Sequence, residues 1–152
     1  TESEGSSTST NSYKFISTGF LIGRAEGFES GFYMLDSSSE SYGNISRELL
    51  IERMTRVCLD QAWLVNAAVH FVFLANLQTL DRIWGARGYR YAMLTAGMMG
   101  ERLYLATEAM GLGCCGIGAF YDAEAAELLS LNPESRLLYL VAVGAVKGLN
   151  LK

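Results

Sequence analysis

The chain has 152 residues, of which 50% are hydrophobic and 18% charged, and this composition indicates one globular domain rather than a disordered segment. The formal net charge is −4 and no basic tract occurs, so we expect no nucleic-acid partner. The longest apolar runs are too short to span a bilayer and no signal peptide is visible, so we expect no membrane association. Three cysteines, two of them adjacent, and one histidine predict neither a disulfide framework nor a metal site, which favours a cytoplasmic protein.

The first half of the chain begins with a polar segment and continues with predicted strands. Residues 1–17 are rich in serine and threonine and are predicted to be a tail ahead of a domain at 18–152. The apolar runs at 18–24 and 32–36 predict two short strands, which could pair as a hairpin through a glycine-bearing loop.

A loop, a helix and a buried strand are predicted next. Residues 37–44 are expected to form the loop, and apolar residues at helical spacing predict a helix over 45–60. The β-branched and aromatic run at 68–74 predicts the strand, in which we interpret His70 as a core residue rather than a catalytic one. A short helix capped by Asn76 should follow.

The longest predicted element is a helix over about 89–111. Two apolar flanks predict that it is buried on two sides, as a central helix, a dimer-interface helix or both. Gly97 and Gly100 each cost about 1 kcal/mol of helix stability relative to alanine, which predicts close approach of another backbone or of a flat ligand. The two flanks are Ala92, Ala96, Met99, Leu103, Ala106 and Met110, and Tyr91, Leu94, Met98, Leu105 and Ala109.

Glycines should end this helix and lead into a glycine-rich segment. Gly111 and Gly113 are predicted helix terminators, and CCGIGAF at 114–120 is expected to be a strand-like loop. A short helix with Asp122 as its N-cap and a final buried strand at 136–144 complete the predicted order. The interleaving of strands and helices favours an α+β domain with one mixed or antiparallel sheet packed by helices.

Several segments in this order resemble the nitroreductase superfamily of FMN-dependent oxidoreductases, and especially its SagB-type dehydrogenase branch. They are RAEGFESGFYMLD (24–36), GARGYRYAMLTAG (85–97), ERLYLATEAMGLG (101–113), CGIGAF (115–120) and LLYLVAVG (137–144). The resemblance implies a nitroreductase-like fold, usually a homodimer with FMN at the subunit interface. Members of the branch oxidise rings in modified peptides, whereas others in the superfamily reduce small molecules with NAD(P)H.

The resemblance also implies a set of cofactor-binding residues. Gly116, Ile117, Gly118 and Ala119 correspond to the loop beside the reactive nitrogen of the flavin, where glycine permits close approach of a ring. Arg90 is a further candidate, and a structural ion pair is its alternative role.

Both ends of the chain supply the remaining candidates. Lys147 follows the final strand, where the family often places a basic residue for the FMN phosphate, but it could equally be a surface lysine. Residues 1–17 are either a polar tail or a remnant of the flavin-binding loop, in which Ser9 and Asn11 would contact the cofactor.

One departure from the family bears on catalysis. The ring-oxidising branch usually has a Lys-Tyr pair where this sequence has Ile83-Trp84, and neither of these side chains can move a proton. No catalytic acid or base is assigned, although Tyr89, Arg90 and Tyr91 are candidates. Two functions therefore stay open: an FMN-dependent oxidoreductase that transfers hydride through the flavin, and a catalytically inactive nitroreductase-like subunit or scaffold that partners a complete copy.

Overall fold

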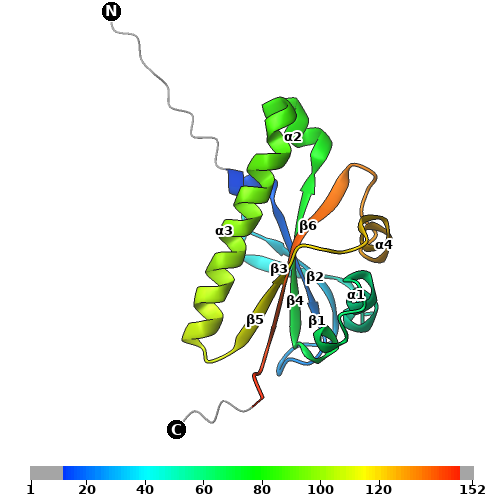
Figure 1. Ribbon diagram of the computed structural model, residues 1–152, viewed down its shortest axis with the longest axis vertical. Coiled ribbons are helices and arrows are strands. Elements are labelled where there is room, and N and C mark those ends of the chain that lie inside the picture. The colour runs from blue at the N-terminus through cyan, green and yellow to red at the C-terminus, as the bar shows by residue number, and fades with distance from the viewer. Residues whose placement is uncertain (1–11, 148–152) are drawn as a thin grey trace, which may run out of the picture.

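A six-stranded sheet runs through the computed structural model, which describes residues 12–147 (Figure 1). The strand order is β3-β2-β1-β4-β6-β5, and each neighbouring pair is antiparallel. The predicted hairpin is confirmed, because the first two strands pair with each other. The strands are β1 (Ser17–Ile22), β2 (Gly31–Asp36), β3 (Ser41–Ser46), β4 (Val69–Asn76), β5 (Gly113–Ile117) and β6 (Ser135–Gly144).

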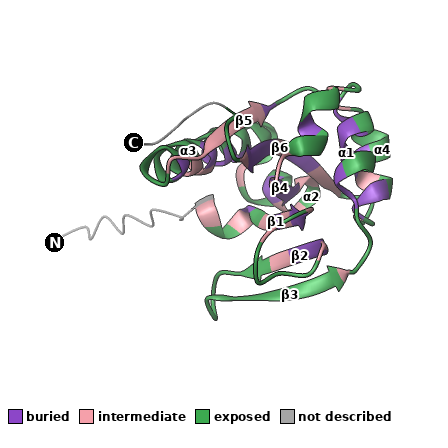
Figure 2. Ribbon diagram, turned by 90° about the horizontal axis from the view of Figure 1, so that it is seen from below, coloured by how far each residue is buried: buried purple, intermediate pink, exposed green. Residues whose placement is uncertain are grey.

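Helices cover both faces of this sheet (Figure 2), and a core cluster of buried residues lies on each face. Helices α2 and α3 lie on one face, and α1 and α4 lie on the other (Figures 1 and 2). The central strands β4 and β6 contribute side chains to both clusters, as expected for strands buried on two faces. The α-helices are α1 (Ile51–Val57), α2 (Leu77–Trp84), α3 (Gly88–Ala109) and α4 (Asp122–Leu128), and short 3₁₀ turns cover Ser12–Phe15, Ala62–Asn66 and Gly85–Arg87.

Strand β3 corrects the predicted loop at 37–44 and the predicted helix start at residue 45. It covers Ser41–Ser46 and pairs with β2, so that Asn44 lies opposite Tyr33. Nearly all its side chains are exposed (Figure 2), so the strand carries no alternation of polar and apolar residues that would predict it. Helix α1 therefore begins only at Ile51.

Helix α3 confirms the long helix but is buried along one side only within this chain. Ala92 and Ala96 of the first apolar flank are buried against the sheet. On the second flank, Leu94 is 60% and Leu105 66% exposed, and Met110 at the end of the first flank is 70% exposed. The predicted burial on two sides is therefore not met by the residues of one chain.

The helix caps and the histidine can also be compared with the predictions. The Asn76 side chain accepts a hydrogen bond from the Thr79 N–H at 2.9 Å, which confirms it as the N-cap of α2. Asp122 is not an N-cap, because α4 begins at Asp122 itself and places its carboxylate in the first turn. His70 is fully buried in β4, with Nε2 3.0 Å from the Leu64 carbonyl oxygen, as expected of a core residue. No helix within the described residues is long and apolar enough to cross a membrane.

Candidate cofactor-binding site

The predicted flavin-contacting segment divides into a strand end and an exposed connection. Strand β5 lies at the edge of the sheet and pairs with β6, with Gly116 opposite Val141. Ile117 ends this strand, and its side chain is buried in the core cluster beneath α1 and α4. Gly118 and Ala119 come next, and both are exposed.

Tyr139 occupies the space that two glycines leave between α3 and β5. A Cβ atom at Gly100 would lie 2.5 Å from Cε1 of Tyr139, and a Cβ atom at Gly116 would overlap its hydroxyl. The Tyr139 ring also stacks on Phe73 with ring centroids 6.3 Å apart. The close approach predicted at Gly100 is real, but it is made by a side chain of this chain rather than by a ligand or another backbone.

A second tyrosine engages the backbone of Gly116. The Gly116 N–H donates a hydrogen bond to the Tyr104 hydroxyl at 2.7 Å. Burial, followed by the nearby Tyr104, Cys115 and Cys114, raises the pKa of Tyr139. The Gly116 N–H is therefore bound by Tyr104, and Tyr139 fills the space beside the Gly116 Cα atom. Sequence analysis missed this pair, because a contact between a helix, an edge strand and its neighbour leaves no local pattern.

Gly118 provides the open backbone that a flat cofactor requires. A Cβ atom there would meet nothing within 4 Å, and its φ is not in the left-handed region. Neither packing nor backbone conformation in this chain demands glycine at this position. Together with the small exposed Ala119, it forms a surface that a ring could approach closely. This is the part of the predicted site that the chain leaves open to a ring.

The other predicted residues lie apart from this segment. From Arg90 to Tyr104, α3 rises by about 21 Å at 1.5 Å per residue. Arg90 is exposed and forms none of the ion pairs found among residues 12–147, so its alternative structural role is not supported. Lys147 is exposed beyond Gly144, which pairs with the first residue of β5, so it lies toward the opposite end of that strand from Gly118.

One chain therefore does not bring the cofactor candidates together. Ser9 and Asn11 lie outside the described residues. Tyr13, near the start of the described residues, has its ring centroid 4.8 Å from the Arg102 guanidinium carbon on α3. The described part of the site is the segment after β5, joined to α3 through Gly116 and Tyr104.

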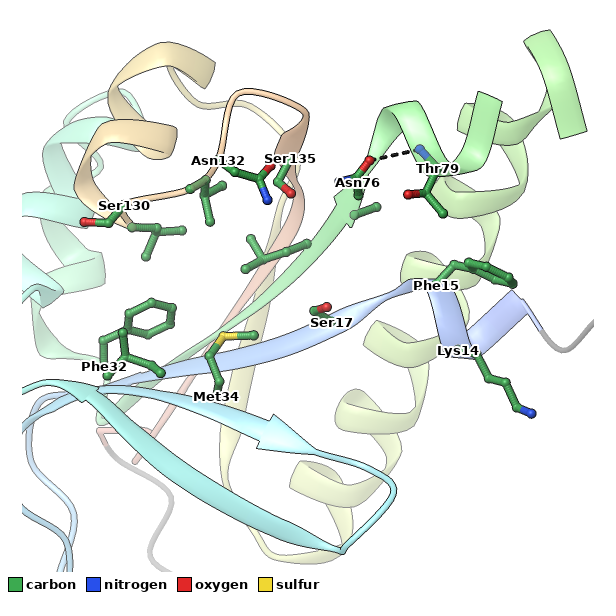
Figure 3. Close-up of a pocket in the computed structure, with 15 residues that line it drawn as sticks. Lys14, Phe15, Ser17, Phe32, Met34, Asn76, Thr79, Ser130, Asn132 and Ser135 are labelled. Carbon is green, nitrogen blue, oxygen red and sulfur yellow. Dashed lines mark hydrogen bonds between the residues drawn. The ribbon is translucent and has the colours of Figure 1, made fainter. Parts of the chain in front are cut away.

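A separate pocket of about 510 Å³ opens between β1, β2, the end of β4 and the connection after α4 (Figure 3). Its walls combine apolar side chains such as Phe32 and Met34 with polar ones such as Ser17 and Asn132. Lys14 is the charged residue that lines it, and its ammonium extends away from the cavity (Figure 3). None of the predicted cofactor residues within 12–147 lines this pocket, and its described lining directs no cation into the cavity.

The sheet and the long helix define a nitroreductase-like α+β fold. A solved nitroreductase-family structure from Anabaena variabilis superposes with a TM-score of 0.82 at 27% identity, covering 86% of this chain and 27% of that chain. Residues 30–145, well over half of the sequence, match the Nitroreductase family. This chain belongs to the nitroreductase family.

Two further relatives define how far the similarity extends. A nitroreductase-family protein of Methanocaldococcus jannaschii is 30% identical over 112 residues, which cover 74% of this chain and 57% of that protein. An NADPH:FMN oxidoreductase from Vibrio harveyi, solved in complex with NAD⁺, matches with a TM-score of 0.55 at 26% identity, covering 64% of this chain and 46% of that chain. The chain spans 57% or less of the length of these relatives.

Proposed function

We propose that this chain forms the core of an FMN-dependent oxidoreductase of the SagB-type dehydrogenase branch. The observation that carries the proposal is the open backbone at Gly118 and Ala119, within the family-matching region and directly after the strand that Tyr104 of α3 contacts. The Vibrio harveyi relative is named as an FMN oxidoreductase, which supports flavin use. When bound, FMN supplies the hydride chemistry, and the protein binds and orients it.

The residues of this chain would divide the work of holding the cofactor. The backbone at Gly118 and Ala119 would lie against the ring, where the absence of bulky side chains allows close contact. The cations Arg90 and Lys147 are the candidates for the phosphate, because charge-assisted hydrogen bonds hold phosphate oxygens strongly.

A homodimer would unite residues that one chain holds apart. Leu94, Met98 and Leu105 form an exposed apolar strip on α3, of the kind that marks an interaction surface. Gly97 lies on the exposed side of the same helix, and a Cβ atom there would meet nothing within 4 Å. A two-fold symmetric contact along α3 would bury this strip and set a second chain beside the segment after β5.

The substrate and electron donor follow from the family resemblance. We propose a small molecule or a modified peptide as substrate, NAD(P)H as an electron donor, and a cytoplasmic location. The direct test is the visible spectrum of the pure protein before and after FMN is added and unbound flavin is removed by gel filtration. Retained flavin absorbance is the expected result, and a colourless protein that retains no FMN would refute the proposal.

An inactive subunit is the second candidate function, and the surroundings of Trp84 favour it. This indole packs edge-on against Phe15, with ring centroids 4.9 Å apart, and against Tyr91 at 5.8 Å. Trp84 therefore has a packing role at the position where the ring-oxidising branch has a side chain that can transfer a proton. If the isolated chain binds FMN and turns over NAD(P)H with an electron acceptor, the inactive alternative fails.

A further inference from the structure

Strand β5 has little of its own to fix the position of the segment that follows it. It covers only Gly113–Ile117 and lies at the edge of the sheet, so β6 is its single strand neighbour. Two of its five residues are glycines, which lose more backbone freedom on ordering than other residues. The position of Gly118, directly after the strand, therefore depends on the contacts that β5 makes besides its pairing with β6.

Tyr104 and Tyr139 fix this edge of the sheet through contacts with Gly116. Tyr104 is fixed on the long helix α3, and its hydroxyl accepts the Gly116 N–H at 2.7 Å from the side of the strand that faces no other strand. Tyr139 lies on β6 with its hydroxyl against Gly116, and Gly100 leaves room for its ring. Gly116 is thus fastened to a helix and to the neighbouring strand, two residues before Gly118.

We infer that Tyr104 is a positioning residue for the cofactor, because it fastens the edge of β5 at Gly116 and so sets where the Gly118–Ala119 backbone stands. The inference rests on the proposed flavin function. Tyr104 acts through Gly116 and need not touch the flavin. A segment that is already ordered before binding costs less to order on binding, so the contact should appear as affinity. Its loss should weaken FMN binding about three- to tenfold, as expected for one hydrogen bond.

The test compares Tyr104→Phe with a matched tyrosine at the opposite edge of the sheet. Tyr104→Phe removes only the hydroxyl, and Tyr42→Phe makes the same change on β3, where the residue is 54% exposed against 42% for Tyr104. Amide hydrogen exchange at Gly116 is measured by NMR in the flavin-free chain, and the FMN dissociation constant by titration of flavin fluorescence. Tyr139→Phe is a second variant, since it keeps the ring that stacks on Phe73.

Tyr104→Phe should accelerate exchange at Gly116 and raise the FMN dissociation constant about three- to tenfold, while Tyr42→Phe changes neither. Faster exchange with an unchanged dissociation constant would overturn the inference, as would unchanged exchange. Equal losses in Tyr104→Phe and Tyr42→Phe would overturn it too, because the effect would then not be local. If the unsubstituted chain takes up no FMN, the proposed function fails together with the inference. If the unsubstituted chain binds FMN and Tyr104→Phe behaves as it does, the inference fails alone and the proposed function stands.

Discussion

Two glycines of α3, one turn apart, should respond differently to alanine. A Cβ atom at Gly97 would meet nothing within 4 Å, so Gly97→Ala should gain the helix propensity of alanine, about 1 kcal/mol. Gly100→Ala makes the same propensity gain, but its Cβ atom would lie 2.5 Å from Cε1 and 3.2 Å from Cδ1 of Tyr139. Overpacking of this kind costs about 1–3 kcal/mol. The propensity gain is common to both variants, so their stabilities should differ by about the overpacking cost, 1–3 kcal/mol.

Urea unfolding of the flavin-free chain measures this difference, at dilutions where sedimentation shows a single chain. The double variant Gly100→Ala/Tyr139→Leu should recover part of the loss, because leucine lacks the ring atoms that the new Cβ atom would meet. The reasoning is refuted if Gly100→Ala is as stable as Gly97→Ala, since Tyr139 would then not fill the space beside Gly100.

Three further predictions concern the rest of the fold. Asn76→Ala should lower the unfolding free energy by about 1 kcal/mol through loss of the α2 cap, and an unchanged urea midpoint would contradict this. Burial lowers the pKa of His70. Below about pH 6.5 the unfolded chain therefore binds the proton more readily than the folded chain does, and the unfolding free energy decreases as the pH is lowered. Between about pH 7.5 and pH 5.5, His70→Gln should lose less stability than the unsubstituted chain. Parallel plots of unfolding free energy against pH for the two proteins would exclude this effect of His70. Hydrogen bonds from Ser38 and Ser39 lower the pKa of Asp36 to about 2, so any stability advantage over Asp36→Asn should be present above about pH 4 and fade toward pH 2; a constant difference would argue against it.

The elements that the sequence could predict are those with a local signal. The apolar run around His70 correctly predicted a strand, and Asn76 correctly predicted the start of a helix. Burial and capping are both encoded within a few residues. Strand β3 could not be predicted in this way. It is held by its pairing with β2 and by contacts of the Tyr42 ring with other elements, and its exposed serine, glycine and asparagine residues are more typical of a turn.

The candidate site shows the same limit more sharply. The segments containing Gly116 and Tyr104 were found from the sequence, but the hydrogen bond between them joins a strand to a helix. Gly100 and Gly118 both suggested room for a ligand. The structure separates their roles, because Gly100 accommodates the ring of Tyr139, whereas a Cβ atom at Gly118 would meet nothing within 4 Å. Such a distinction depends on which side chain arrives from another element, and no local pattern records it.

FMN titration of Gly118→Val tests the central claim most directly. The Cβ atom of the new side chain would meet nothing within 4 Å and the backbone is compatible, so the thermal midpoint of the flavin-free protein should not change. Valine would stand where the flavin ring is proposed to approach, so we expect FMN affinity to fall by about tenfold or more, or about 1.4 kcal/mol. Glycine-to-valine substitution at Gly43, which also has open space, is the matched control and should bind FMN as the unsubstituted chain does. Equal FMN binding by Gly118→Val and the unsubstituted chain would contradict the account, because the flavin could not then lie against this segment.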